Sequence, residues 1–413
     1  MNLHKRQNKA FLLIATVVLG SVVFLNQLLK TNVMSHLFPL PSIEQEKQAN
    51  SSGMGQNDWP PPVPSSASPQ EQNETRNGSD ASEQRLRSTQ GQCPYRVDSL
   101  DEPAGKTEWH SGGWAVRRRC SQPLDTLFFV HTAPSTWQRR ANLRATLLEE
   151  GAARFFNWTG VFFIGEQDDH TVSLWTALET RVMGDVVMLP YNDTRMSVVH
   201  KFVGGMRWVL EYCPTVRHIV KIDDDVNVHP FELRRYLDVE LPLRDTHLHC
   251  FVFRKSRVYR ENGGRFCVDE YDLPQDTYPL YCSGRSVIMT LNTMRVLYAA
   301  SKIVKAFPVD DAYVTGHLAL LANVGHVFIN DRFDWSYSDK TEYVLEENTL
   351  FTHEYFAYGN SIERRAQWGL VLWQRVMDDG IGWNLSHRFK DKEYRQDFED
   401  TRHHLLGSPL YTY

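Results

Sequence analysis

Four short apolar runs, separated by segments of helical character, set the strongest constraint on how this chain can fold. Each run has the length of a buried strand, and strands that alternate with helices are typical of βαβ units. The runs are Leu127–Val130, Gly160–Gly165, Asp185–Leu189 and His218–Ile222. Because βαβ units pair their strands in parallel and cover both faces of the sheet, we expect an α/β fold with a mainly parallel central sheet.

Two helices are expected between these runs. The segment from Arg139 to Glu150 places its leucines on one side, and the segment from Val199 to Leu210 repeats apolar residues at helical spacing. Pro214 ends the second segment, since proline cannot continue a helix. Both helices are therefore expected to pack one apolar face on the sheet.

The last apolar run ends in an acidic triplet, Asp223–Asp225. Side chains alternate along extended backbone, so Asp223 and Asp225 are expected to point the same way. Two such carboxylates suit a hard divalent cation that also binds substrate phosphates. The triplet follows its strand at the carboxyl end, which is where ligands bind on parallel sheets.

The triplet has two other interpretations. A solvated acidic turn is common, but the apolar run before the triplet argues against it. A calcium-binding loop matches Asp223, Asp225 and Asn227, but Val228 stands where such a loop needs glycine and Arg234 where it needs glutamate. A cation site at the end of a strand is the interpretation that remains.

The N-terminal region contains an apolar segment, Ala10 to Leu29, long enough to cross a bilayer as a helix. Lys5, Arg6 and Lys9 precede it, which favours an N-terminus in the cytosol and the rest of the chain across the membrane. A cleaved signal peptide is the alternative, but its apolar region would be shorter and followed by a small-residue cleavage site. We expect a type II signal anchor.

The chain after this segment has features of the secretory pathway. Its six cysteines suit an oxidising compartment. We expect three bridges between them, Cys93–Cys120, Cys213–Cys282 and Cys250–Cys267. Sequons for N-glycosylation stand at Asn50, Asn73, Asn77, Asn157, Asn192 and Asn384. A net charge of −5 and a pI near 6.4 give no basic footprint for nucleic acid.

Several sequence blocks together resemble the β1,3-galactosyltransferases of glycosyltransferase family 31. The resemblance extends over residues 125–330. The blocks are Arg139–Thr146, similar to R-R-x-x-I-R-x-T; Glu179–Asp185, continued by Lys201, Arg207–Trp208 and Tyr212–Pro214; Lys221–Val226, similar to K-x-D-D-D-V; Tyr278–Gly284, matching Y-P-x-Y-C-S-G; and Pro308–Tyr313, similar to P-x-[ED]-D-V-[YF]. Their common order makes the resemblance specific.

The resemblance implies a GT-A fold, a UDP-sugar donor and Mn²⁺. Asp225 and Asp223 would bind the metal, with Asp223 and Asp224 also near the donor, and Asp311 would be the catalytic base. Residues expected to contact the donor are Arg140, Arg144 and Lys201, and those expected on the acceptor side are Tyr281, Ser283, Gly284 and Asp310.

These assignments have simpler alternatives. Asp311 is also a suitable N-cap for a helix beginning near Ala312. Arg140 and Arg144 fit a solvated helix face equally well, and Lys201 fits the protein surface as well as a phosphate contact. The family also commonly has glycines where this chain has Arg285–Ser286, which leaves the acceptor open.

A stem rich in Ser, Asn, Gln, Glu and Pro is expected to be disordered. Residues from Ser361 to Asp378 are expected to form an amphipathic helix. The expected division is a cytoplasmic tail (1–9), a transmembrane anchor (10–29), a lumenal stem (30–92), a GT-A catalytic domain (93–345) and a C-terminal helical extension packed on it (346–413).

We therefore expect an inverting, Mn²⁺-dependent glycosyltransferase that transfers galactose from a UDP-sugar to a glycan, glycoprotein or glycolipid in β1,3 linkage. N-acetylglucosamine is the alternative sugar. An inactive glycan-binding partner protein is the alternative of a different class. A single-pass Golgi membrane protein with a lumenal catalytic domain is expected, and its oligomeric state is left open.

Overall fold

The computed structural model describes residues 93, 95–97, 99–100, 112–241, 246–260, 266–334, 349–353, 370, 373–374 and 376–377. The strands are β1 (Thr126–His131), β2 (Trp158–Glu166), β3 (Val186–Asn192), β4 (His218–Asp223), β5 (Val226–Val228), β6 (His247–Phe253), β7 (Tyr281–Thr290), β8 (Gly325–Phe328), β9 (Phe333–Asp334) and β10 (Phe351–His353). The expected anchor, most of the stem and most of the C-terminal extension lie outside the described residues.

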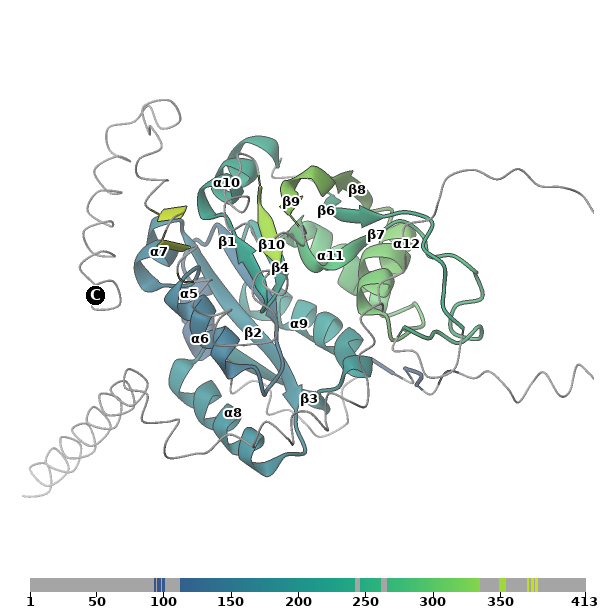
Figure 1. Ribbon diagram of the computed structural model, residues 1–413, viewed down its shortest axis with the longest axis horizontal. Coiled ribbons are helices and arrows are strands. Elements are labelled where there is room, and N and C mark those ends of the chain that lie inside the picture. The colour runs from purple at the N-terminus through teal and green to yellow at the C-terminus, as the bar shows by residue number, and fades with distance from the viewer. Residues whose placement is uncertain are drawn as a thin grey trace, which may run out of the picture. The chain divides into compact units, whose positions relative to one another are not determined.

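Helices connect most of these strands (Figure 1). The α-helices are α5 (Trp114–Cys120), α6 (Trp137–Ala145), α7 (Glu150–Phe155), α8 (His170–Met183), α9 (Val198–Tyr212), α10 (Pro230–Arg235), α11 (Leu291–Ser301) and α12 (Ala319–Leu321). Short 3₁₀ segments are η2 (Arg195–Ser197) and η5 (Asn330–Arg332), and π-helical segments are η3 (Tyr236–Glu240) and η4 (Ala312–Leu318).

A seven-stranded sheet forms the centre of the domain, in the order β3-β2-β1-β4-β7-β6-β8. Neighbouring strands from β3 to β4 are parallel, and β6 is parallel to β8. Only β7 runs against its neighbours β4 and β6 within this sheet. The expected α/β class with a mainly parallel sheet is therefore confirmed, and the reversed β7 is an addition that the sequence did not predict.

Alternating side chains of the strands pack into two apolar clusters, one on each face of the sheet. In β1, Leu127 and Phe129 belong to one cluster, whereas Phe128 and Val130 belong to the other, and all four are fully buried. Helices α9 and α11 contribute to the first cluster, and α6, α7 and α10 contribute to the second. Because both faces are covered, the strands are apolar throughout, as the sequence showed.

A small second sheet, in the order β5-β10-β9, lies next to the acidic triplet in the chain. Its strand β5 begins at Val226, immediately after Asp225, and pairs with β10 in the antiparallel sense. Trp373, Val376 and Met377, from the predicted C-terminal helix, are buried in the second apolar cluster. The chain leaving the triplet is therefore held by residues far along the sequence.

The helix expected from Arg139 to Glu150 is two helices in the structure. Helix α6 ends at Ala145, and α7 begins at Glu150 with the Glu149 side chain accepting a hydrogen bond from the Ala152 N–H group. The buried Trp158 indole donates to the Leu147 carbonyl at 2.9 Å between the helices. The Leu147 carbonyl is therefore bonded to a residue outside the helix, where α6 has already ended. The spacing of the leucines could not predict this break, because the break depends on Trp158, which lies further along the chain.

The three disulfides differ from the expected pairing. The structure joins Cys93 to Cys267, Cys120 to Cys213 and Cys250 to Cys282. The last bridge links the neighbouring strands β6 and β7, and the second links the ends of α5 and α9. Bridges follow neighbours in space, and those neighbours depend on the sheet order rather than on proximity in sequence.

Two of the predicted sequons lie in described residues. Asn157 is half-buried and its side-chain oxygen accepts a hydrogen bond from Arg119 at 2.5 Å, whereas Asn192 is exposed and donates to Asp168 at 3.0 Å. Asn50, Asn73, Asn77 and Asn384 lie outside the described residues. Within the described part of the chain, no helix has both the length and the apolar character to span a membrane.

Candidate active site

The carboxyl ends of β1 and β4 and the beginning of β7 meet at one edge of the sheet. His131 at the end of β1 pairs with Asp223 at the end of β4. Because β7 is antiparallel to β4, with Ser286 opposite Ile222, its first residues return to this same edge. The reversed strand thereby brings Gly284 to the acidic triplet, although the two are far apart in sequence.

Asp224, the middle residue of the triplet, is buried and points into the protein. Its carboxylate accepts hydrogen bonds from the hydroxyls of Thr132 and Thr136, both at 2.6 Å, and from Arg139 at 3.0 Å. Its backbone N–H donates to the His131 carbonyl at 3.0 Å. Asp224 thus fixes the loop after β1, and its carboxylate is already engaged there rather than directed at a ligand.

Asp223 and Asp225 are the more exposed members of the triplet, although Asp223 ends β4 and Asp224 and Asp225 form the turn before β5, so the three do not share the extended backbone expected from the sequence. The Asp223 side chain is 36% exposed and the Asp225 side chain 20% exposed. Asp223 accepts a hydrogen bond from Lys221 at 2.5 Å, and Asp225 lies 3.3 Å from Arg139. Both carboxylates therefore present oxygen atoms to solvent at this edge.

The electrostatics of the pair suit a cation. The surrounding protein raises the pKa of Asp223 to about 6, mainly through loss of hydration and then through repulsion by Asp225, although Lys221 opposes both. Within the described residues, no group of three His, Cys, Asp or Glu side chains is arranged to hold a metal. Two hard oxygen ligands with open positions suit a divalent cation that shares its coordination with a substrate phosphate.

Asp311 lies across this edge, at the start of η4. One carboxylate oxygen accepts a hydrogen bond from the Ala312 N–H at 2.8 Å, and the other accepts one from the Gly284 N–H at 3.2 Å. A Cβ atom at position 284 would lie 3.3 Å from Asp311, so glycine permits this close approach. Burial raises the pKa of Asp311 to about 7, and the charge of Asp310 adds to the rise.

The helix-capping interpretation of Asp311 is therefore realised in part, because the side chain does bond to Ala312. A carboxylate oxygen has more than one lone pair, so this contact leaves capacity to accept a proton. A carboxyl group with a pKa near neutrality and two fixed N–H partners has the properties of a general base.

Lys221 connects the two halves of the site. It is almost completely buried, and its ammonium donates to Asp223 and to the Gly284 carbonyl. It stands two residues before Asp223, on the same side of β4. The sequence analysis quoted Lys221 as part of the motif but gave it no role. Its position two residues before Asp223, on the same side of the strand, could have indicated that it contacts this carboxylate.

Asp310 and Lys201 lie at this edge too, the first with its side chain 21% exposed and the second buried. Lys201 is buried and donates to the Thr132 carbonyl at 2.6 Å and to Asp193 at 3.0 Å, so it is not the surface residue of the simpler alternative. An oxygen of Asp310 is 4.0 Å from Nδ1 of His131, and burial keeps the pKa of that histidine well below its usual value. Lys201 therefore holds the loop after β1 through its bond to the Thr132 carbonyl.

Arg140 and Arg144 are held by carboxylates of the protein. Arg140 is completely buried and bonds to Glu179, to the Thr132 hydroxyl and to the carbonyls of Ala133 and Pro134. Every guanidinium nitrogen of Arg140 is thus hydrogen-bonded within the protein. This geometry is that of a residue that positions its surroundings, rather than one that contacts the UDP-sugar or lies on a solvated helix face.

Arg144 has a comparable arrangement one helical turn later. It makes a paired contact with both oxygens of Asp185, at 2.7 Å each, and a further bond to Glu179 at 2.7 Å. Glu179 therefore joins both arginines of α6 to α8. The sequence singled out the arginines and quoted Glu179 and Asp185, but did not foresee that these residues form one network of ion pairs around the buried Arg140.

The expected acceptor-side residues are divided between exposed and buried positions. Tyr281 is half-buried, with its ring 5.3 Å from Phe253 and 5.6 Å from Tyr278 between centroids. Burial and then the charge of Asp311 raise the pKa of Tyr281 to about 12, so the hydroxyl stays protonated. Ser283 is buried, whereas Gly284 bonds to Asp311, and Asp310 precedes Asp311 in the chain with its side chain 21% exposed.

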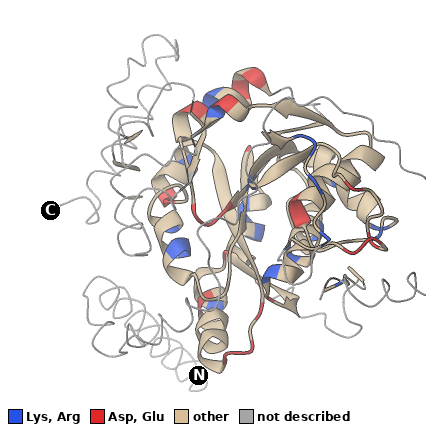
Figure 2. Ribbon diagram, turned by 45° about the vertical axis from the view of Figure 1, so that its right-hand side comes forward, with Lys and Arg blue, Asp and Glu red and all other residues tan. Residues whose placement is uncertain are grey.

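Charges of both signs are interspersed over the described ribbon (Figure 2). The acidic edge is accordingly a local feature of the site.

Comparison with known proteins identifies the family. The galactosyltransferase family profile matches residues 138–329 of this chain. A human protein named acetylgalactosaminyl-O-glycosyl-glycoprotein beta-1,3-N-acetylglucosaminyltransferase is 30% identical over 289 residues, which cover 67% of this chain and 72% of that protein. The chain belongs to the galactosyltransferase family. The resemblance drawn from the motifs is therefore confirmed.

Other galactosyltransferase-family relatives are more distant or align over shorter stretches. The mouse protein of the same name as the human one is 29% identical over 210 residues, 49% of this chain and 53% of that protein. Human beta-1,3-galactosyltransferase 2 is 23% identical over 255 residues, 60% of each protein. The chain thus spans little more than half the length of several of these relatives.

Among solved structures, one described as a glycosyltransferase involved in the glycosylation of the major capsid of PBCV-1 aligns with a TM-score of 0.35 and 12% identity. The alignment covers 60% of this chain and 100% of that one. This likeness is too slight to support any statement about function.

The buried arginine network generates a stability prediction. Glu179→Ala removes the carboxylate from the completely buried Arg140, and an uncompensated buried charge lowers the free energy of unfolding by about 3 to 5 kcal/mol. The matched control is Glu150→Ala, which breaks a pair with Arg154 whose side chains are 80% and 78% exposed. Chemical denaturation should show a large loss for the first variant and none for the second. Equal losses would contradict the buried role.

Proposed function

We propose that this galactosyltransferase-family chain is an inverting β1,3-glycosyltransferase of the GT-A fold, which uses a UDP-sugar and a divalent cation such as Mn²⁺. The observation that carries the proposal is the meeting of two outward carboxylates, Asp223 and Asp225, with a separate carboxylate, Asp311, at one edge of the sheet. Sugar transfer from a nucleotide needs at least a carboxylate site for the cation and a separate carboxylate as base, and this edge has candidates for both.

The leaving group of this reaction is a diphosphate that gains negative charge as the sugar departs. A cation bound by Asp225 and Asp223 would supply the neutralising positive charge. Asp224 and Arg139 would keep the triplet in place through their contact at 3.0 Å. Lys221 would hold Asp223 in position at the same time, because it bonds to that carboxylate.

The acceptor hydroxyl is a poor nucleophile and needs a base to remove its proton as the new bond forms. Asp311 would take this proton, with its orientation fixed by the Gly284 and Ala312 N–H groups. Attack on the face of the sugar opposite the leaving diphosphate turns an α-linked donor into a β-linked product. This outcome is what the names of the β1,3-transferring relatives describe for those proteins.

The relatives bear on the donor sugar. The human relative at 30% identity is named for N-acetylglucosamine transfer, whereas the human protein named for galactose transfer is 23% identical. We therefore place UDP-N-acetylglucosamine ahead of the UDP-galactose expected from the motifs. The acceptor is proposed to be a glycan on a protein or lipid.

We further propose that the chain is a type II Golgi membrane protein with its catalytic domain in the lumen. Three disulfides in the folded domain fit an oxidising compartment, and the exposed Asn192 is accessible to glycosylation. The apolar segment from Ala10 to Leu29 would provide the anchor.

Turnover measured with single-residue variants tests the proposed function. The full-length chain in detergent is expected to release UDP from one UDP-sugar in the presence of a glycan acceptor, and EDTA should abolish this release. Asp225→Asn and Asp311→Asn should each lower kcat by about 100-fold or more. Asp331→Asn changes an exposed carboxylate on η5, outside the proposed metal and base residues, and should leave turnover unchanged.

Turnover that both site variants retain would contradict the proposed residues. Donor binding without turnover across UDP-sugars and a broad acceptor panel would favour the inactive glycan-binding partner.

The pH dependence of this turnover is a second prediction. A base must be unprotonated, so kcat/KM should fall as pH decreases through the pKa of Asp311, which is about 7 in the protein alone. Charged groups facing Asp311 are Asp310, which raises the pKa, and Lys221, which lowers it; a cation at Asp225 would act like Lys221.

Asp310→Asn removes the repelling charge and should move the acid limb of the profile to lower pH. An acid limb that moves to higher pH in Asp310→Asn would contradict the assignment of Asp311 as the base.

A further inference from the structure

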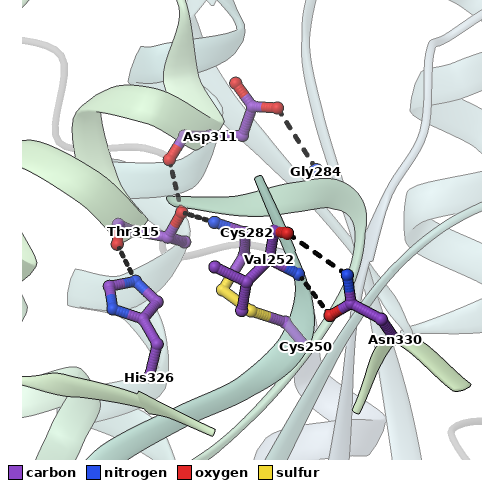
Figure 3. Close-up of a disulfide and its surroundings, with 8 residues drawn as sticks. All are labelled: Cys250, Val252, Cys282, Gly284, Asp311, Thr315, His326 and Asn330. Atoms are coloured by element: carbon purple, nitrogen blue, oxygen red, sulfur yellow. Dashed lines mark hydrogen bonds between the residues drawn. A yellow bond between two sulfur atoms is a disulfide. The ribbon is translucent and has the colours of Figure 1, made fainter. Parts of the chain in front are cut away.

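A buried threonine of the helical segment η4, Thr315, contacts β7, and η4 begins directly after Asp311 (Figure 3). Its hydroxyl donates to the main-chain carbonyl of Asp311 at 2.5 Å and accepts the N–H of Cys282 at 2.9 Å. The side chain has no exposed surface. One hydroxyl therefore joins the residue that carries the proposed base to the first part of β7.

Strand β7 reaches Asp311 by two separate routes. The Cys282 N–H acts on the backbone of Asp311 through Thr315, and the Gly284 N–H donates directly to the Asp311 carboxylate at 3.2 Å. These donors are two residues apart, so both point to the same side of the strand. The backbone and the carboxylate of Asp311 are thus held against a single strand.

Covalent and polar contacts fix that strand. A disulfide joins Cys282 to Cys250 on β6 (Figure 3). The ring of His326, on β8, lies 2.7 Å from the Thr315 carbonyl. A Cβ atom at Gly316 would lie 3.0 Å from the Cβ of Tyr281, so η4 packs directly on β7. These contacts hold the part of η4 around Thr315 close against β7.

We propose that Thr315 is a positioning residue that sets the placement of the Asp311 carboxylate relative to the acceptor hydroxyl. The proposal rests on the function given above, in which Asp311 is the base. Replacing the hydroxyl by a methyl group leaves the Cys282 N–H without its buried acceptor and removes the Thr315 bond to the Asp311 carbonyl, which favours a shift of η4 away from β7. Such a shift lengthens the bond from Gly284 and misplaces the carboxylate.

Three variants of the full-length chain separate positioning from general stability. Thr315→Val keeps the shape of the side chain but lacks the hydroxyl, and Thr315→Ser restores it. Thr293→Val removes a hydroxyl that is equally buried, at the start of α11, where it bonds to Thr290 at 3.0 Å. Both valine variants are expected to lower the melting temperature.

Only Thr315→Val should lower kcat, by about 10-fold to 100-fold, because a misplacement of the order of an ångström is enough to cost that much. Its KM for the UDP-sugar should stay within about twofold, since Thr315 bonds to Asp311, Cys282 and His326 and the change is directed at the base. Thr315→Ser should recover most of the lost kcat. A Thr315→Val protein with unchanged kcat, or one matched in kcat by Thr293→Val, would overturn the proposal.

Hydrogen exchange at the Gly284 amide gives a reading that does not require turnover. Thr315→Val should speed exchange at this amide by at least about 10-fold, and Thr315→Ser and Thr293→Val should not. If the parent protein turns over no UDP-sugar, the proposed function fails while the exchange result still decides whether Thr315 positions Asp311. Unchanged exchange in Thr315→Val would refute that role.

Discussion

A buried lysine holds the acidic edge of this domain together. Lys221 reaches from β4 to Asp223 and to the carbonyl of Gly284, so it joins the parallel half of the sheet to the reversed strand β7. Removing an ammonium from water is costly unless it is paired and hydrogen-bonded, and these two partners meet that condition. Asp311 also contacts Gly284, so the placement of the proposed base depends on the same junction.

The three consecutive aspartates, at the end of β4 and in the turn after it, divide two tasks between one buried and two more exposed side chains. Asp224 turns inward and is satisfied by Thr132, Thr136 and Arg139, whereas its neighbours on either side turn outward. Inward bonding fixes the triplet, and that rigidity allows the outward carboxylates to stay close together despite their repulsion. The outward pair keeps an excess of negative charge that a cation would relieve.

The sequence predicted the parts of this structure that depend on local pattern. Continuous apolar runs predicted β1 to β4, because each run is a property of neighbouring residues. The break after Ala145, the pairing of Cys250 with Cys282 and the full enclosure of Arg140 depend on residues distant in the chain. The reversal of β7 likewise leaves no local signal, and it is what unites Gly284 with the triplet. Motif resemblance could name Asp311 but could not show its partners.

Binding of Mn²⁺ measured by calorimetry, with UDP present and without acceptor, tests the central claim that the outward carboxylates form a cation site. The parent chain is expected to bind one Mn²⁺, and Asp225→Asn should lose this binding. Asp311→Asn should retain it, because Asp311 is assigned to the base and not to the metal. Binding that survives Asp225→Asn, or that disappears only in Asp311→Asn, would contradict the division of roles at this edge.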